Sequence, residues 1–311
     1  MRTAFLYAGQ GSQRVGMGLD FYTEYPEYRA FADSLSLPFD VIRIMHEGPM
    51  EELSKTEYTQ ASMATFAAGV TLLLKSRGIT PDAALGLSLG EYGALQAAGV
   101  FGAEEYVALT AFRGRVMAEA ANGLSCSMSA ILGAETSVVE AACEGYNGPG
   151  YVTVANYNCP GQIVICGDEE AVASVEAVLK EQGAKRCIRL NVSGPFHTKF
   201  MKPAGEKLRE YFTGISFGKA QIPVLLNVTG DYLKEDDSVQ ELLIRQVQSS
   251  VRLEAQLRRL LAGGFERFIE IGPGNTMAGF LKKTAKAMGT EVTVVSIDKV
   301  EDFRNLVGET A

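Results

Sequence analysis

The 311-residue sequence lacks several features that would place it in a particular class of protein. It has no run of about 18 apolar residues, so no membrane-spanning helix is expected. Its N-terminal apolar stretch is too short for the core of a signal peptide. The formal net charge of −8 argues against a non-specific nucleic-acid binder, which normally carries a basic surplus. We therefore expect a cytoplasmic protein that binds neither nucleic acid nor membranes.

Cysteine and histidine are scarce, which limits redox, metal and acid–base chemistry. The five cysteines are odd in number, form no Cys-x-x-Cys pair and have no histidine near them in sequence. They are interpreted as small apolar fillers, so neither a disulfide framework nor a metal site is expected. Only His46 and His197 can serve as a histidine base. His46 lies at a helix end or loop before Pro49 and is interpreted as a solvated side chain.

Strand and helix patterns alternate along most of the chain. Core strands are predicted at residues 3–7, 83–87, 223–228, 267–271 and 292–296. Core helices are predicted at residues 25–34, 49–53, 60–75, 89–98, 103–121, 199–212, 239–248, 253–262, 275–288 and in a last segment up to residue 307. Such alternation is typical of a mostly parallel sheet covered on both faces. The predicted fold class is α/β, with an α/β-hydrolase-like core.

The texture of the sequence changes between residues 125 and 192, where the predicted segments become short. Their order is strand 128–132, helix 136–143, strand 152–156, strand 162–166, helix 169–182 and strand 186–190. A β-α-β-β-α-β order is the ferredoxin-like pattern. We therefore predict a small α+β subdomain at 125–192, inserted into a large core made of residues 1–124 and 193–311.

The stretch from Gly86 to Tyr92 joins a predicted strand directly to a predicted helix. It reads Gly-Leu-Ser-Leu-Gly-Glu-Tyr, and Gly-x-Ser-x-Gly in this context is typical of a nucleophile elbow. The glycines let the backbone turn sharply, and the turn exposes the Ser88 hydroxyl at the end of the strand. The free N–H groups of the following helix then face any oxyanion formed there. The alternative interpretation is a tight structural turn with a serine cap.

A serine at an elbow needs a base, because an unassisted hydroxyl is a poor nucleophile at neutral pH. His197 follows Gly194 and Pro195 at the return from the inserted subdomain, where a cleft is expected. An α/β-hydrolase would place an acid, and then its histidine, nearer the C-terminus. Here more than a third of the chain follows His197, and no acidic residue stands out as its orienting partner. We predict a two-member Ser88–His197 arrangement with a backbone carbonyl setting the histidine tautomer.

Six short motifs occur in order along the chain, at residues 7–13, 86–92, 112–117, 156–162, 194–198 and 270–274. In this order and spacing they resemble malonyl-CoA:acyl-carrier-protein transacylases, and they are similar to acyltransferase domains of polyketide and fatty acid synthases. The resemblance implies transfer of malonyl from malonyl-CoA to the phosphopantetheine thiol of acyl carrier protein, for fatty acid biosynthesis. One departure is Leu87, where the family commonly has histidine.

The resemblance also implies a role for individual residues. Ser88 would form the acyl-enzyme of a ping-pong reaction, with His197 as its base. The backbone N–H groups of Gln10 and Leu89 would form the oxyanion hole. Arg113 would hold the free carboxylate of the malonyl group, which a guanidinium fork can pair through two oxygens at once.

The same resemblance implies roles for two further residues and indicates the binding partners. Gln246 matches the family glutamine whose backbone carbonyl orients the histidine. Phe196 resembles the malonyl-selective pattern, although a core aromatic is an equally good interpretation. No resident cofactor or metal is implied, because the substrates carry CoA and phosphopantetheine themselves. We expect a monomer that meets malonyl-CoA and an acidic carrier protein.

Three alternatives remain at this stage. A discrete acyltransferase of a polyketide pathway would carry the same motifs. A serine thioesterase or esterase would share Ser88 and His197 but would have no use for Arg113. A non-catalytic carrier-binding protein would leave all three residues as coincidences. For the carrier protein, the candidate basic patches are Lys282, Lys283 and Lys286 on one predicted helix, or Lys199, Lys202 and Lys207 after His197.

Overall fold

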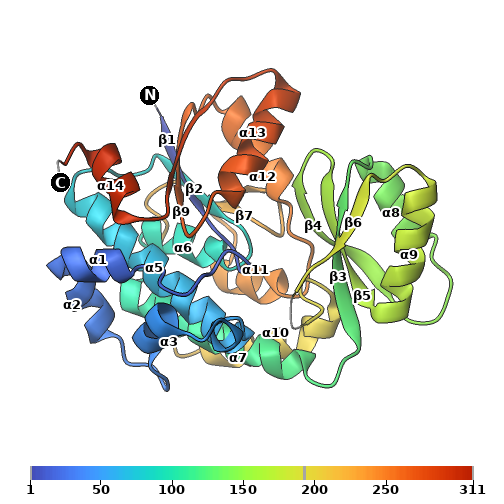
Figure 1. Cartoon of the computed structure of the whole chain (residues 1–311), viewed down its shortest axis with the longest axis horizontal. Helices are drawn as coiled ribbons and strands as arrows, with labels where there is room; N and C mark the ends of the chain where they lie inside the picture. The colour runs from blue at the N-terminus through green and yellow to red at the C-terminus, as the bar shows by residue number, and fades with distance from the viewer. Residues whose placement is uncertain (1, 192–193, 310–311) are drawn as a thin grey trace.

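The computed structural model describes residues 2–191 and 194–309, and it shows a large α/β core beside a smaller antiparallel unit (Figure 1). A parallel sheet runs through the middle of the core with helices on both of its sides (Figure 1). The smaller unit, drawn in green and yellow, lies at one end of the molecule (Figure 1). The α/β class predicted from the alternation is therefore confirmed.

Four parallel strands form the sheet of the core, in the order β10-β9-β1-β2. They are β1 (Thr3–Tyr7), β2 (Ala83–Gly86), β9 (Arg267–Ile271) and β10 (Thr293–Ile297). Every residue of β1 is buried, and its successive side chains point to opposite faces. Phe5 and Tyr7 enter one hydrophobic core, whereas Ala4 and Leu6 enter another. Both faces of the sheet are therefore covered.

Helices of the core supply the two layers that cover this sheet. One face packs with α5 to α7, and the opposite face packs with α12 and α13. The core helices are α1 (Leu19–Glu24), α2 (Pro26–Ser34), α3 (Val41–Glu47), α4 (Met50–Leu53), α5 (Thr56–Ser76), α6 (Gly90–Ala97), α7 (Ala103–Ala121), α10 (Lys202–Phe212), α11 (Val239–Gln246), α12 (Leu253–Ala262), α13 (Thr276–Met288) and α14 (Val300–Val307), with a 3₁₀ turn at Lys199–Met201.

The smaller unit has its own sheet and its own hydrophobic core. Its elements are β3 (Cys126–Leu132), α8 (Thr136–Glu144), β4 (Val152–Cys159), β5 (Gln162–Asp168), α9 (Glu169–Glu181) and β6 (Arg186–Arg189). The strand order is β4-β5-β3-β6 with antiparallel pairs throughout, so β5 lies between the two strands of the first βαβ unit. This is the split arrangement of the β-α-β-β-α-β pattern. The boundary predicted between residues 192 and 193 lies outside the described residues.

The structure corrects the sequence analysis at two places. The strand predicted at 223–228 is reduced to β7 (Leu225–Leu226), which pairs with the unpredicted β8 (Asp231–Tyr232). Pro223 has no N–H to donate, and its carbonyl accepts the N–H of Ala84 at 3.0 Å, so this segment contacts β2 without continuing the sheet.

His46 is the second correction, because it is not a solvated side chain. It lies in the last turn of α3, which agrees with the helix end that was one of the two predicted settings, although the bounds of α3 and the helix α1 were not predicted. Its ring is half-buried and packs edge-on against Tyr22, with 5.3 Å between the ring centroids. This burial lowers the pKa of His46 below its ordinary value, so the residue serves packing.

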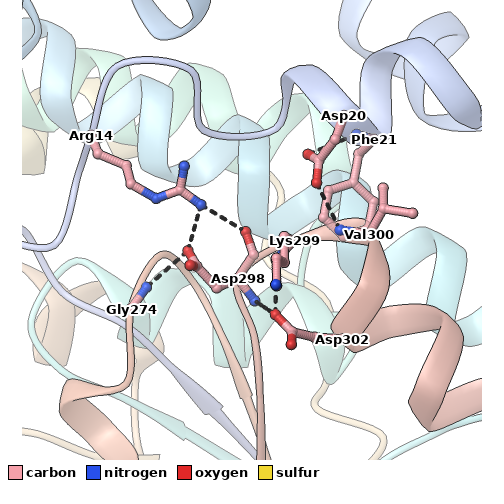
Figure 2. A network of polar contacts seen from close by, with 8 residues as sticks. All are labelled: Arg14, Asp20, Phe21, Gly274, Asp298, Lys299, Val300 and Asp302. Carbon is pink, nitrogen blue, oxygen red and sulfur yellow. Dashed lines mark hydrogen bonds and ion pairs between the residues drawn. The ribbon is translucent and has the colours of Figure 1, made fainter.

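A polar network joins the loop after β1 to the C-terminal segment (Figure 2). Arg14 donates from Nη2 to the carbonyl oxygen of Asp298 at 3.1 Å and to its Oδ1 at 2.8 Å. The same Oδ1 accepts the N–H of Gly274 at 3.0 Å. Nearby, the N–H of Val300 donates to Oδ2 of Asp20 at 2.7 Å. Asp298 therefore ties together two loops and the start of α14, which are far apart in sequence.

We predict that Asp298→Ala lowers the free energy of unfolding by about 1–2 kcal/mol, because Arg14 and Gly274 lose their shared acceptor. Urea unfolding followed by circular dichroism measures this change. Glu301→Ala is the matched control, since the one ion pair it forms in the described part of the chain is an exposed one with Lys299. Its unfolding midpoint should match that of the wild type. An unchanged midpoint in Asp298→Ala would contradict the prediction.

Candidate active site

The turn between β2 and α6 presents Ser88 in an unusual backbone conformation. Ser88 has a φ of 54°, in the left-handed region that L-residues rarely adopt. A Cβ on Gly86 would lie 1.9 Å from the carbonyl carbon of Gly90, and a Cβ on Gly90 would lie 2.3 Å from the carbonyl oxygen of Tyr7. Only glycine fits both positions, so the sequence forces a tight turn whose apex is the serine hydroxyl.

His197 faces Ser88 from the loop before the 3₁₀ turn. Its Nε2 lies 2.7 Å from the Ser88 Oγ, and its Nδ1 lies 2.9 Å from the carbonyl oxygen of Gln246. A carbonyl can only accept, so Nδ1 carries the proton and Nε2 is free to accept from the serine. Its backbone N–H donates to the carbonyl oxygen of Val247 at 3.0 Å. The end of α11 therefore fixes both the backbone and the tautomer of His197.

Ser88 and His197 share their backbone strain. His197 has a φ of 61°, and these two are the only non-glycine residues with positive φ in the described parts of the chain. Such strain costs on the order of 1–3 kcal/mol per residue and concentrates at functional sites. Its coincidence on the two residues whose side chains meet supports a catalytic interpretation of the pair.

The imidazole of His197 is neutral at physiological pH. The side chain is buried, which lowers its pKa to about 4, and the nearby positive charge of Arg113 acts in the same direction. A neutral imidazole can accept the serine proton, whereas an imidazolium cannot. The site is therefore poised for general-base chemistry without an acidic third residue.

Arg113 reaches the same site from the middle of α7 and is fully buried. Its Nη1 donates to Gln60 Oε1 at 2.7 Å, and its Nη2 donates to Gln246 Oε1 at 2.9 Å and to Ser88 Oγ at 3.1 Å. Burial lowers the pKa of the guanidinium below its ordinary value. Within the described residues its Nε has no partner. The arginine thus places its positive charge beside the nucleophile and keeps one N–H without a partner among the described residues.

Two backbone N–H groups are candidates for an oxyanion hole. Neither the N–H of Gln10 nor that of Leu89 has a hydrogen-bond partner in the described part of the chain. Leu89 directly follows the nucleophile and precedes α6. The Gln10 side chain is held by Thr56, whose Oγ1 accepts from Nε2 at 3.1 Å. The loop after β1 is therefore fixed with its backbone at the site.

A cavity of about 260 Å³ lies over Ser88 and His197. It runs between the core and the smaller unit, and its walls are mostly apolar. Phe196 lines this cavity and is also part of the core cluster, so both interpretations of this residue apply. Leu87 lines it as well and gives the cavity an apolar contact beside Ser88. The remaining wall includes Gln60, Met117, Met128, Val164 and Phe280.

The sequence analysis missed three buried polar residues around this site: Gln60, Glu91 and Asn227. Gln60 comes from α5 and accepts from Arg113. Asn227 follows β7, and its Oδ1 accepts the N–H of Ser88 at 2.7 Å. Glu91 belongs to the elbow motif, but the motif predicts no role for it. The sequence signal for these three residues is a polar side chain within an otherwise apolar segment. This signal does not identify the group that the side chain contacts.

No group of three or more His, Cys, Asp or Glu side chains could hold a metal ion among residues 2–191 and 194–309. None of the described helices is both long enough and apolar enough to cross a membrane.

A half-buried serine in contact with a buried histidine, two unpartnered backbone N–H groups among the described residues and an adjacent buried arginine on an α/β fold are the features of a serine acyltransferase. The family model for the acyl transferase domain matches residues 4–306. The malonyl CoA-acyl carrier protein transacylase of Bacillus subtilis is 40% identical over 292 residues, which is 93% of this chain and 92% of that protein.

Solved structures agree with this assignment. MCAT from Streptococcus pneumoniae has a TM-score of 0.92 at 39% identity, covering 99% of this chain and 100% of its own. A malonyl-transacylase in complex with its type II polyketide acyl-carrier protein has a TM-score of 0.92 at 31% identity and covers 100% of both chains. This chain belongs to the family of malonyl CoA-acyl carrier protein transacylases. The resemblance that the six motifs indicated is confirmed.

We predict that the reactivity of Ser88 stays flat as the pH falls through 6.5 and declines only well below 6. The reason is the depressed pKa of His197, which keeps the accepting neutral form until strongly acidic pH. The rate of Ser88 labelling by a sulfonyl fluoride, measured from pH 4 to pH 8, tests this. Ser88→Ala should give no label. A half-maximal rate at or above the ordinary histidine value of about 6.5 would contradict the prediction.

Proposed function

We propose that this protein transfers malonyl groups from malonyl-CoA to the phosphopantetheine thiol of acyl carrier protein, for fatty acid biosynthesis. The observation that carries the proposal is Arg113, a buried guanidinium that donates to the Oγ of Ser88. A buried cation beside an acyl nucleophile suits an acyl group with its own negative charge. The names of the relatives, malonyl CoA-acyl carrier protein transacylases, support the same substrates.

The first half-reaction follows from the hydrogen bonds of the free site. His197 Nε2 accepts the proton of Ser88 while Oγ attacks the thioester carbonyl of malonyl-CoA. The N–H groups of Gln10 and Leu89 would stabilise the tetrahedral oxyanion. The carbon–sulfur bond then breaks, and the imidazolium of His197 returns its proton to the CoA thiolate. The product is a malonyl ester on Ser88.

The second half-reaction uses the same groups in reverse. The carrier-protein thiol gives its proton to His197 and attacks the ester of Ser88 through its sulfur. Collapse of the second tetrahedral intermediate returns the proton to Oγ and leaves malonyl on the carrier. CoA leaves before the carrier thiol reacts, so the reaction is ping-pong.

Arg113 would select the substrate by pairing with the free carboxylate of malonyl. Gln60 and Gln246 accept from its two terminal nitrogens, so the guanidinium is already oriented before the substrate enters. A charge-assisted pair of this kind contributes on the order of 1.5–3 kcal/mol. Acetyl-CoA would leave the guanidinium without a carboxylate, which disfavours it further.

The remaining features of the proposal follow from this chemistry. No resident cofactor is needed, because CoA and phosphopantetheine arrive on the substrates. We place the reaction in the cytoplasm and expect a monomer. The second candidate is service to a polyketide carrier protein, which the 31% identical malonyl-transacylase of a type II polyketide system favours. A thioesterase is a weaker candidate because hydrolysis makes no use of Arg113.

We predict that malonyl-CoA adds the mass of one malonyl group to Ser88, and that Arg113→Ala slows this acylation at least about 10-fold. Peptide mass mapping after rapid quenching locates and times the adduct. Arg115→Ala is the matched control, because Arg115 lies two positions further on α7 with an exposed side chain. It should acylate at the wild-type rate.

Two outcomes of the same experiment would contradict the proposal. Equal rates with acetyl-CoA and malonyl-CoA would show that Arg113 does not select a carboxylate. Release of free malonate as fast as the loading of a carrier protein would indicate a thioesterase. Running the same assay once with a fatty-acid carrier protein and once with a polyketide carrier protein separates the two pathway candidates.

The structure favours one of the two lysine patches for docking the carrier protein. The lysines after His197 are partly neutralised, because Lys207 pairs with Glu119 at 2.6 Å and Lys202 lies 3.9 Å from Glu206. On α13, Lys283 instead donates to the neutral Gln162 at 3.2 Å. The residues Thr276, Met277 and Phe280 of the same helix line the active-site cavity. Among the described residues no lysine of the α13 patch forms an ion pair, and the patch lies on a helix that lines the site.

We predict that the triple variant Lys282→Glu, Lys283→Glu and Lys286→Glu raises the KM for carrier protein at least about 10-fold at low salt, because opposite charges steer this encounter. The KM for malonyl-CoA and the rate of Ser88 acylation should stay unchanged. The corresponding triple variant at Lys199, Lys202 and Lys207 is the control and should change the carrier KM less than about twofold. An unchanged carrier KM in the α13 variant would exclude that patch.

A further inference from the structure

Asn227 is a fully buried residue on the loop that follows β7. The segment leading to it contacts β2 through the bridge between Ala84 and Val224. Its carbonyl oxygen accepts the N–H of Arg252 at 2.9 Å, which anchors the loop to the start of α12. Asn227 and Ser88 therefore follow neighbouring segments and lie at the same edge of the sheet.

The side chain of Asn227 contacts the elbow where the chain leaves β2 and reaches Ser88. Its Oδ1 accepts the backbone N–H of Ser88 at 2.7 Å, and its Nδ2 donates to the carbonyl oxygen of Gly86 at 2.7 Å. The same Oδ1 also accepts from Gln246 Nε2 at 3.3 Å. A second donation from Nδ2 goes to Gln256 Oε1 at 3.2 Å. The carboxamide thus bridges Gly86 and Ser88 and fixes the backbone that leads from β2 into the strained turn.

Glu91 fixes Asn227 in turn. It lies in the first turn of α6, is fully buried, and accepts the backbone N–H of Asn227 through Oε2. Its other oxygen has no partner among the described residues. Burial raises the pKa of Glu91 to about 8, so a neutral carboxyl is the main form at pH 7. Glu91 therefore acts as a hydrogen-bond acceptor, a role that does not need a charge.

We propose that Asn227, held by Glu91, is a positioning residue that keeps Ser88 in its left-handed, reactive conformation. The inference rests on the proposed role of Ser88 as nucleophile. Neither residue touches the reacting atoms, and both act through the backbone of the elbow. A hydroxyl displaced by about 1 Å from its base can lose about 100-fold in rate.

Asn227→Asp is the sharpest test, because it keeps the shape of the side chain and the acceptor for Ser88. It removes the donor to Gly86 and places an oxygen against that carbonyl instead. We expect Ser88 acylation by malonyl-CoA and Ser88 labelling by a sulfonyl fluoride to fall by the same factor, about 30- to 100-fold. The KM for malonyl-CoA should stay within about twofold, because Arg113 keeps its partners.

Gln96→Glu is the matched control for burying a carboxyl in place of an amide. Gln96 lies near the far end of α6, is buried, and has no partner for its Oε1 in the described structure. The Gln96→Glu variant should lower the melting temperature about as much as Asn227→Asp does. It should leave the rates of Ser88 acylation and Ser88 labelling unchanged. This separates a positioning effect from a general loss of stability.

The pair Glu91→Gln and Glu91→Ala decides the role of Glu91, and it decides the inference if Asn227→Asp does not fold. Glutamine keeps an acceptor for Asn227, so its rates should exceed those of the alanine variant by about 10-fold or more. Equal rates in Asn227→Asp and wild type, or equal loss in both Glu91 variants, would overturn the inference. If wild-type Ser88 takes neither malonyl nor sulfonyl, the proposed function itself fails.

Discussion

A left-handed backbone at Ser88 is the constraint on which the rest of the site depends. Such a conformation costs about 1–3 kcal/mol and persists only where the surroundings overdetermine it. Here two glycines admit the turn, the carboxamide of Asn227 bonds to the backbone of Gly86 and of Ser88, and Gln246 Nε2 donates to the Ser88 carbonyl at 2.9 Å. His197 carries the same strain and is held by the end of α11. Strain at both partners leaves Oγ and Nε2 in contact before any substrate binds.

A single buried guanidinium then sets the electrostatics of the cleft. Arg113 is fully buried, and burial strengthens its field, because a low dielectric screens charge poorly. Burial lowers the pKa of His197, and this field adds to the shift. In the proposed reaction the same field would attract an anionic acyl group and stabilise a negative charge that develops on Ser88, so one residue would serve both selection and chemistry. The cost of burying its charge is offset by hydrogen bonds to neutral oxygens of Gln60 and Gln246.

Much of this site could be predicted from the sequence, where local patterns carry the information. Gly-x-Ser-x-Gly between a strand and a helix located Ser88, and helix α7 has the bounds that its pattern predicted. Contacts made by segments distant in sequence could not be predicted. Asn227 lies 139 residues from Ser88, and no local pattern reports which elbow its amide reaches. The segment at 223–228 was overestimated as a strand because its apolar run outweighed Pro223, whose missing N–H stops the ladder.

The carbonyl of Gln246 explains why this pair can work without an acid. A carboxylate placed on His197 Nδ1 would also lie near Arg113, where it would compete with an incoming malonyl carboxylate for the guanidinium. Gln246 avoids this, because its backbone carbonyl orients the histidine while its side chain accepts from Arg113, both without charge. Glu91, a buried acid that contacts Asn227, is kept largely neutral by its burial. The cleft therefore offers its positive charge to the substrate rather than to the protein, which a Ser-His-Asp arrangement in the same place could not do.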